Sequence, residues 1–312
     1  LTKAKSHLKK DEILEAKKLY QSVLQVFPKN IRAQQGLTLL KNRNKANFTK
    51  TPPQVEVDQL INLYNQGQFT SVIEKAKILL EKYPETFILW NIIGNSTIQL
   101  GLLDSAVEAY SKCISLKPDN ADVYCNMGIA FKDQGKLDKA IKAFEKSISL
   151  KPDFAIAYNN LGNALKDYGK IESSIKAYEK CLSLKTDYAE AYNNLGLVLK
   201  IKNELDKAIK AYKKCIALKP NFAEAYNNLG NALTNLKKFD EAIEVYQKCI
   251  SLKPDYANVY SNMGIAYKDQ GKYDEAIEAF EKCISFKTDY AEAYINLGIT
   301  YKNKDEFDKS IE

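Results

Sequence analysis

The sequence contains very few of the side chains on which enzyme active sites depend. Histidine occurs once, as His7, in a chain of 312 residues. No grouping of His, Cys, Asp or Ser has a spacing suited to nucleophilic catalysis or to metal binding, and no glycine-rich loop is placed to cradle a phosphate. The sequence therefore predicts that these residues form no enzyme active site and bind no cofactor or metal.

Arginine is nearly absent as well. The net charge of +7 is carried by lysine, because arginine occurs only at Arg32 and Arg43. Recognition of phosphates and guanine bases favours the planar fork of arginine over the point charge of lysine. We therefore interpret the lysines as a solvated surface and expect no nucleic acid among the partners.

Long apolar runs are also missing. No segment approaches the roughly 18 consecutive apolar residues that a membrane-spanning helix requires. Residues 1–20 carry scattered lysines instead of the apolar core of a signal peptide. The sequence thus predicts no membrane partner and a cytoplasmic location. Because it starts at Leu1 without a methionine and stops at Glu312 within a repeat, we expect a fragment of a longer protein, continued by further repeats or another domain.

What the sequence does contain is a segment of 34 residues, Ala121–Phe154, that recurs at a fixed spacing. Self-similarity at such a period is typical of solenoids, in which each repeat buries its apolar face against its neighbours. The further copies are Ala155–Tyr188, Ala189–Phe222, Ala223–Tyr256, Ala257–Tyr290 and a last copy cut off at Glu312.

Each repeat has the pattern of two amphipathic helices joined by a turn. Counted from 1 at Ala121, apolar or small residues occupy positions 4, 7, 8 and 11, and then 17, 20, 21, 24, 27 and 28, which is helical spacing. Gly135 separates the two stripes and Pro152 follows the second, as expected of helix ends. We expect the glycine at position 8 to face the small residue at position 20. Capping boxes are expected between repeats, at Asp187 with Glu190, Asn221 with Glu224, and Asp289 with Glu292.

The repeat resembles the tetratricopeptide repeat (TPR). The matching features are Trp or Tyr at position 4, Leu at 7, Gly at 8, Tyr or Phe at 11, Ala at 20, Tyr or Phe at 24, a small residue at 27 and Pro at 32. The resemblance implies an all-α fold, an α-solenoid of stacked helix–turn–helix hairpins that forms a right-handed superhelix lined by the first helix of each hairpin. Long arrays of this kind resemble the TPR arm of the O-linked N-acetylglucosamine transferases.

The repeat register also divides the chain. We expect a degenerate repeat at residues 1–30, an orphan helix and polar linker at 31–52, and a continuous array at 53–312. The repeats of that array are expected at 53–86, 87–120, 121–154, 155–188, 189–222, 223–256, 257–290 and, truncated, 291–312.

Five of the six cysteines occupy position 27, on the apolar stripe of the second helix. Neighbouring helices pack about 8–10 Å apart, whereas a disulfide requires Cα atoms within about 7 Å. We therefore interpret these cysteines as small buried apolar residues in a reducing compartment. Cys125, at position 5, is the one cysteine that we expect to be exposed.

Position 6 is asparagine in every repeat from Ala121 onward. Asparagine is a poor helix former, and positions 2, 6, 9 and 13 lie opposite the packing stripe of the first helix. We interpret the series as a ladder of amides that binds the backbone of an extended peptide, as in the O-linked N-acetylglucosamine transferases. The alternative is that these amides bond within or between repeats. The residues are Asn126, Asn160, Asn194, Asn228, Asn262 and Asn296.

The same helix face is predicted to be acidic and to be flanked by lysines. This charge favours neutral or basic peptide segments and disfavours nucleic acid or an acidic tail. The acidic residues are Asp122, Glu190, Glu224 and Glu292 at position 2, and Asp133, Asp167 and Asp269 at position 13. The lysines, at position 12, are Lys132, Lys166, Lys200 and Lys268.

These observations favour a protein-interaction scaffold that binds extended peptides. A second hypothesis is that the repeats are the substrate-recruiting arm of a larger enzyme whose catalytic domain lies outside residues 1–312. That enzyme would be a glycosyltransferase of the O-linked N-acetylglucosamine type, a sulfotransferase or a methyltransferase. RNA-binding helical repeats are disfavoured by the period, the TPR pattern and the acidic face.

Overall fold

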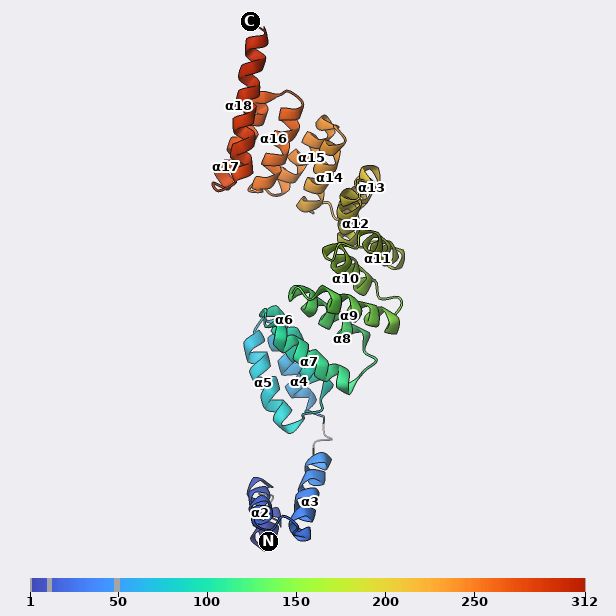
Figure 1. The fold of residues 1–312 in the computed structure, drawn as a ribbon, viewed down its shortest axis with the longest axis vertical. Helices are drawn as coiled ribbons and strands as arrows, with labels where there is room; N and C mark the ends of the chain where they lie inside the picture. Colours follow the sequence, from blue (N-terminus) through green and yellow to red (C-terminus); the bar gives the residue numbers. More distant parts are fainter. Residues whose placement is uncertain (1, 10–12, 48–50, 312) are drawn as a thin grey trace. The chain divides into compact units, whose positions relative to one another are not determined.

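The computed structural model describes residues 2–9, 13–47 and 51–311, and it describes no side chains at 5, 6, 8, 9, 13, 41–47 and 306–311. Every regular element in the described ranges is an α-helix, as the repeat pattern predicts (Figure 1). The chain packs into two compact regions, Leu1–Ala130 and Phe131–Glu312. We call them the N-terminal and C-terminal regions and describe each by itself.

The helices of the first half of the chain are α1 (Thr2–Lys9), α2 (Ile13–Val26), α3 (Ile31–Asn47), α4 (Gln54–Asn65), α5 (Phe69–Lys82), α6 (Phe87–Gln99), α7 (Leu103–Leu116) and α8 (Ala121–Asp133). Those that follow are α9 (Leu137–Leu150), α10 (Ala155–Asp167), α11 (Ile171–Leu184), α12 (Ala189–Ile201), α13 (Leu205–Leu218), α14 (Ala223–Asn235), α15 (Phe239–Leu252), α16 (Ala257–Asp269), α17 (Tyr273–Phe286) and α18 (Ala291–Ile311).

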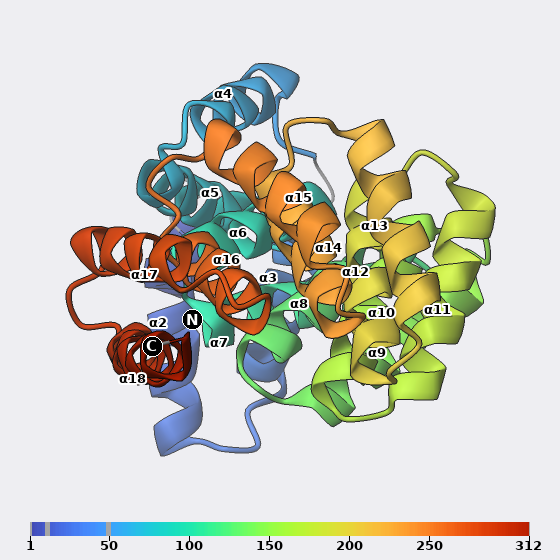
Figure 2. The same cartoon turned by 90° about the horizontal axis from the view of Figure 1, so that it is seen from above.

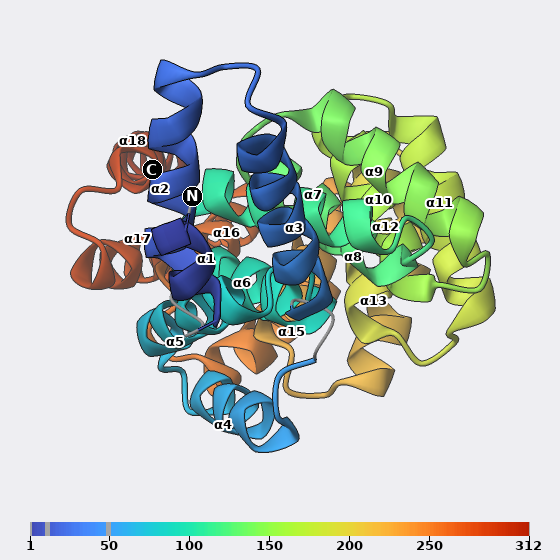
Figure 3. The same ribbon diagram turned by 90° about the horizontal axis from the view of Figure 1, so that it is seen from below.

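At the amino end, α1, α2 and α3 pack around Ala4, Ala16, Tyr20 and Ala33 (Figure 3). Helix α3 continues to Asn47, so it takes up most of residues 31–52, which the sequence predicts to hold an orphan helix and a polar linker. The domain boundaries themselves stay a prediction.

The turn inside each hairpin depends on a left-handed residue at position 15. Gly135 and Gly169 have φ angles of 72° and 84°, which glycine adopts without steric cost. Asn203 and Lys237 occupy the same position with φ angles of 63° and 57°. Asparagine tolerates this region, whereas a lysine there is strained. The turn thus persists where the sequence departs from glycine.

The predicted capping boxes are wrong for the described helices at which they can be checked. The N-cap residues of α12 and α14 are the aromatic residues Tyr188 and Phe222 at position 34, and neither forms a side-chain cap. The ammonium groups of Lys185 and Lys219, at position 31, lie 5.0 Å and 4.8 Å from the centroids of these rings. A cation–π contact therefore occupies the junction where the sequence predicted an acidic cap.

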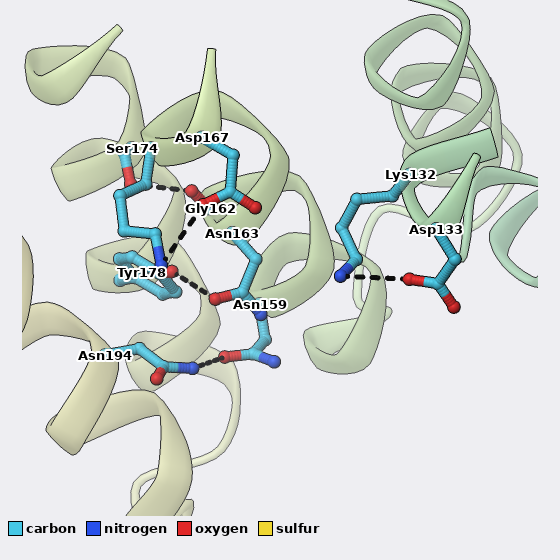
Figure 4. A network of polar contacts seen from close by, with 10 residues as sticks. Lys132, Asp133, Asn159, Gly162, Asn163, Asp167, Ser174, Tyr178 and Asn194 are labelled. Carbon is cyan, nitrogen blue, oxygen red and sulfur yellow. Dashed lines mark hydrogen bonds and ion pairs between the residues drawn. The ribbon is translucent and has the colours of Figure 1, made fainter. Parts of the chain in front are cut away.

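The glycine at position 8 permits close packing, but against a different residue from the one predicted. A Cβ atom on Gly196 would lie 2.5 Å from Cε1 of Tyr212, and one on Gly162 would lie 2.7 Å from Cε1 of Tyr178. The aromatic ring at position 24, not the small residue at 20, thus fills the space that a side chain would need. Position 20 still contacts the glycine backbone, since Ser174 Oγ donates to the Gly162 carbonyl at 2.7 Å (Figure 4).

The buried face of the first helix is wider than the predicted stripe. Ala157 and Ala164, at positions 3 and 10 of α10, are fully buried, whereas Tyr158 and Leu161, at positions 4 and 7, are only half-buried. Positions 3 and 10 are filled because a first helix packs against neighbouring repeats as well as against its own partner. Position 5 belongs to this face too, so the predicted exposure of Cys125 is wrong: only 2% of it is accessible.

The cysteines at position 27 are buried, as predicted, and none forms a disulfide. Burial raises the pKa of Cys113 to about 12 and the pKa of Cys181 and Cys215 to about 11. A thiol with such a pKa is unreactive near neutral pH. In α15, Cys249 Sγ donates to the carbonyl of Ala223 at 3.0 Å and so ties the second helix to the start of the first.

The last helix differs from its predecessors. Helix α18 runs without interruption from Ala291 to Ile311, through position 15, where the other repeats turn. Position 15 is here Asp305 instead of glycine. Gly298, at position 8, has no described atom outside its own helix backbone within 4 Å of the place where its Cβ would lie. Phe307 and Ile311, at positions 17 and 21 of this repeat, lie outside the described side chains.

The first helices lie on the inside of the curve of the C-terminal region. Helices α10, α12, α14, α16 and α18 each approach the next in that series, whereas α11, α13, α15 and α17 make no such approach to one another within the described residues (Figure 2). We call the surface formed by positions 2, 6, 9 and 13 of α10, α12, α14 and α16 the inner face. The second helices form the outer face.

Candidate functional site

The position-6 asparagines of the C-terminal region bond from one repeat to the preceding one. Nδ2 of Asn194 donates to Oδ1 of Asn159 at 3.2 Å (Figure 4). The same contact joins Asn228 to Asn193 at 3.0 Å and Asn262 to Asn227 at 2.9 Å. In each pair the acceptor stands at position 5. The structure thus realises the inter-repeat hydrogen bond that the sequence left as an alternative.

This bond uses one N–H of each position-6 amide and does not involve the oxygen of that amide. The Oδ1 atoms of Asn194 and Asn262 accept no hydrogen bond from the described residues, and both side chains are half-buried, whereas Asn228 is 7% exposed. An amide can donate two hydrogen bonds and accept two. The inter-repeat bond therefore holds the position-6 side chain in place and leaves its own oxygen, Oδ1, without a hydrogen bond from the described residues.

The ends of the asparagine series depart from this arrangement. Asn126 Nδ2 donates to Asn95 Oδ1 at 3.2 Å, and Asn91 Oδ1, at position 5, is left buried without a partner. In α18, Asn296 donates to the carbonyl of Glu292 at 3.0 Å and accepts from Lys268 Nζ at 3.3 Å. The remaining member, Asn160, is half-buried in α10.

Two of the predicted site residues meet at a pocket on the inner face. The pocket has a volume of about 240 Å³ and contains Lys200 of α12 and Asn262 of α16. Its other lining residues are Asn231, Thr234, Asn235, Tyr246 and Ile265. Amide, hydroxyl and aliphatic groups thus line a single hollow that spans three successive first helices.

Positions 9 and 24 form a second polar contact that sequence reasoning missed. The hydroxyl of Tyr178 donates to Asn163 Oδ1 at 2.7 Å (Figure 4), and that of Tyr246 donates to Asn231 Oδ1 at 2.7 Å. In α12–α13 position 9 is Leu197, and the hydroxyl of Tyr212 is buried without a partner. Burial raises the pKa of all three tyrosines. The joint occurrence of Asn at 9 with Tyr at 24 was the signal available in the sequence.

The predicted acidic stripe is partly neutralised. At positions 12 and 13, Nζ of Lys132 lies 3.2 Å from Oδ1 of Asp133 (Figure 4). The same two atoms are 3.2 Å apart in Lys166 and Asp167 and 3.9 Å apart in Lys268 and Asp269. Ion pairs as exposed as these contribute little to stability, but they reduce the net charge of the stripe.

The position-2 carboxylates divide into paired and exposed groups. Glu190 accepts from Lys219 Nζ at 2.7 Å, and this hydrogen bond lowers the pKa of Glu190. Glu224 is exposed on α14, and Asp122 and Glu292 are exposed on α8 and α18. Exposed carboxylates of this kind remain available to a cationic partner.

The described residues show neither a metal site nor a membrane span. No group of three or more His, Cys, Asp or Glu side chains within the described ranges is arranged to hold a metal ion. None of the helices in those ranges combines the length and the hydropathy needed to cross a bilayer.

Comparison with known proteins places the repeats in a family. Three models of the tetratricopeptide repeat match the chain, and together they cover residues 94–154 and 162–289, more than half of its length. One matches 121–154, another 221–289, and the third 94–135, 162–201 and 198–237. No curated protein matches the sequence.

Solved structures share the fold. YrrB, described as a TPR protein with an unusual peptide-binding site, is 24% identical, with a TM-score of 0.53 over 61% of this chain and 97% of its own. MamA is 33% identical, with a TM-score of 0.50 over 53% of this chain and 97% of its own.

The APC/C hetero-tetramer Cut9–Hcn1 is 19% identical, with a TM-score of 0.63 over 92% of this chain. The match spans only 52% of the Cut9–Hcn1 chain, so this chain covers about half of that relative. The family models, the helical hairpins and these neighbours agree: the chain belongs to the tetratricopeptide repeat family, whose architecture is that of a protein-interaction scaffold.

Proposed function

We propose that the C-terminal region binds extended peptide segments of partner proteins along its inner face. The proposal rests on the hydrogen bonding of Asn194 and Asn262. Each is held by a hydrogen bond to the preceding repeat, and each keeps an amide oxygen that no described residue uses. An extended peptide presents backbone N–H groups that such oxygens accept. YrrB, which shares this fold, is described as having a peptide-binding site.

The inter-repeat bonds favour binding because they restrict the amides before the peptide arrives. Immobilising a flexible side chain at an interface costs about 0.5–1.5 kcal/mol, and the bond to position 5 covers part of that cost within the folded protein. Each neutral hydrogen bond to the peptide contributes only about 0.5–1.5 kcal/mol. A ladder of a few amides therefore supports weak, sequence-tolerant binding, with selectivity supplied by neighbouring side chains.

The neighbouring side chains favour neutral or basic peptides. Lysine and arginine are absent from positions 2, 6, 9 and 13 of α10, α12, α14 and α16, and Glu224 is exposed there. The ion pairs of Asp167 and Asp269 moderate this preference. Of the lysines at position 12, Lys200 lines the inner-face pocket and Lys268 donates to Asn296, so these two moderate the preference without reversing it.

The test is titration calorimetry with three unstructured peptides of equal length. One contains only Gly, Ser, Thr and Val, and in the others lysines or glutamates replace the serines. We expect the neutral and lysine peptides to bind, and the glutamate peptide to bind about tenfold more weakly, which corresponds to about 1.4 kcal/mol. Tighter binding of the glutamate peptide, or no binding of any of the three, would contradict the proposal.

A further inference from the structure

A hollow in the C-terminal region lies on the outer face, away from the asparagines. It has a volume of about 600 Å³ and opens between the second helices α11 and α13, above the first helix α12. We call it the outer cleft. Its apolar lining consists of Ile175, Tyr192, Leu195, Leu199 and Ala211.

The next repeat carries larger apolar residues at two positions that line this cleft. The lining includes Lys202 at position 14 and Ala211 at position 23. In the next repeat these positions hold Leu236 and Val245, which pack against the hydrophobic core. The outer helices do not approach one another within the described residues, so side chains decide how far the space between them is filled. Alanine is the usual residue at position 23, as at Ala177 and Ala279, and with Lys202 and Ala211 the space stays open.

The rim of the outer cleft is rich in lysine. Lys202 and Lys207 both bind Glu204, at 3.0 Å and 2.7 Å. Lys176, Lys210 and Lys214 also line the cleft, and none of them forms an ion pair with a described residue. Glu172 and Glu179 complete the rim. The cleft is thus lined by five lysines and three glutamates. The lysines that form no ion pair with a described residue come from both bordering helices, Lys176 from α11 and Lys210 and Lys214 from α13.

Helix α13 supplies most of this positive charge, in contrast to the helix that follows. Lys207, Lys210, Lys213 and Lys214 of α13 face one acidic residue, Asp206, whereas α15 carries Asp240, Glu241 and Glu244 with Lys248. The formal charges are +3 and −2. The basic character of the outer face is therefore concentrated in the helix that borders the open cleft.

We propose that the outer cleft binds an acidic amphipathic helix of a partner protein. Apolar side chains on one face of such a helix would enter the hollow over Leu195 and Leu199, in the helix-in-groove mode. Its carboxylates would pair with Lys176, Lys210 and Lys214. Such a helix supplies at once an apolar surface that covers the apolar floor and negative charge that pairs with the lysines of the rim.

The composition of the cleft argues against a polyanion. A nucleic acid would bring phosphates past Glu172, Glu179 and Glu204, which would repel them, and it would bury no apolar surface on the floor. The cleft and the inner face are therefore expected to prefer opposite charges. One chain could hold two different segments, a neutral or basic strand inside and an acidic helix outside.

The test is fluorescence anisotropy with a labelled helical peptide of about 18 residues, or five turns. The peptide carries leucine on one face and glutamate on the other, and a second peptide has lysine in place of glutamate. We expect the glutamate peptide to bind at least about tenfold more tightly than the lysine peptide. Equal binding of the two peptides would overturn the proposal.

Variants that copy residues of the next repeat distinguish peptide binding in the outer cleft from attraction by the overall positive charge of α13. Lys202→Leu with Ala211→Val installs the residues of the filled repeat and should weaken binding of the glutamate peptide about tenfold. Lys210→Glu, which copies Glu244, should weaken it similarly. Lys213→Glu is the control, because Lys213 lies on the same helix but does not line the cleft, and it should change binding by no more than about twofold.

Two results would overturn this assignment. One is that the Leu/Val variant, shown to be folded by circular dichroism, binds the glutamate peptide as tightly as the wild type. The other is that sedimentation equilibrium shows the chain itself to self-associate, and that the same variant abolishes this association without affecting the peptide. In that case the occupant of the cleft is a second copy of the chain.

Discussion

Hairpins α10–α11 and α12–α13 follow one another in the chain, yet they satisfy the rules of the repeat to different degrees. In the first, Tyr178 donates to Asn163 and the turn is made by Gly169. In the second, Tyr212 is buried without a partner and Asn203 makes the turn with a φ angle of 63°. The backbone is nevertheless the same, helix for helix.

The difference teaches that the backbone and the side-chain details are specified separately. The glycine and the aromatic ring at positions 8 and 24 set the backbone in both hairpins. The differences at Leu197 and Lys202, which stand where α10–α11 has Asn163 and Tyr168, lie outside that contact. Lys202 lines the outer cleft.

The largest effect is expected where the two hairpins agree. Gly196→Leu would place a side chain in the space of the Tyr212 ring and should lower the free energy of unfolding by about 1–3 kcal/mol. Gly162→Leu should cost the same, because Tyr178 occupies the same place. Urea denaturation measures both. Gly298→Ala is the control: among the described residues no atom outside its own helix backbone lies within 4 Å of the added Cβ, so the higher helix propensity of alanine should raise stability by up to about 1 kcal/mol. Unchanged stability of Gly196→Leu would contradict the packing.

A smaller effect should have opposite signs in the two hairpins. Tyr178→Phe removes the hydrogen bond to Asn163 and should cost about 0.5–1.5 kcal/mol. Tyr212→Phe removes a buried hydroxyl that has no partner, so stability should stay the same or rise by up to about 1 kcal/mol. The two variants are compared by urea denaturation at one pH. Equal losses would show that Tyr212 has a partner in solution.

The repeat pattern in the sequence predicts most of the fold. Position 15 predicts each turn and position 27 predicts buried cysteines, because both depend on spacing along one hairpin. The burial of positions 3, 5 and 10 could not be predicted in this way, because it arises from packing between hairpins. The prediction for Cys125 failed for that reason. The predicted caps failed because the chain reaches the next helix through the aromatic residue at position 34, as at Tyr188.

The candidate site was predictable as a series of residues but not as a set of contacts. The recurrence of asparagine at position 6 is visible in the sequence, whereas its bond to position 5 of the preceding repeat depends on how hairpins stack. The outer cleft could not be predicted, because Ala211 is the usual residue at position 23 and position 14 varies between repeats, so the sequence does not mark this place.

Transplanting one contact should make the second hairpin resemble the first. Leu197→Asn gives Tyr212 the partner that Asn163 gives Tyr178. In this background Tyr212→Phe should cost about 1 kcal/mol, although it costs nothing in the wild type, so the double-mutant cycle should show a coupling of about 1 kcal/mol. Urea denaturation of the four proteins measures the cycle. Additive effects would mean that asparagine at 197 does not reach the hydroxyl.

The most direct test of the inner face uses two variants that remove the same inter-repeat bonds. Asn194→Ala with Asn262→Ala removes the donors and also the amide oxygens proposed to bind peptide. Asn159→Ala with Asn227→Ala removes only the buried acceptors. Both double variants should lose similar stability, measured by urea denaturation, since each removes the same two bonds.

Peptide binding should separate them. In calorimetry with the neutral extended peptide, the variant at 194 and 262 should bind about tenfold more weakly than the wild type, as expected for two lost hydrogen bonds. The variant at 159 and 227 should lose clearly less, about threefold, because its amide oxygens are intact and only the restriction of the two side chains is lost. Equal losses in both variants, or no loss in either, would show that the position-6 asparagines hold the repeats together and do not bind the peptide.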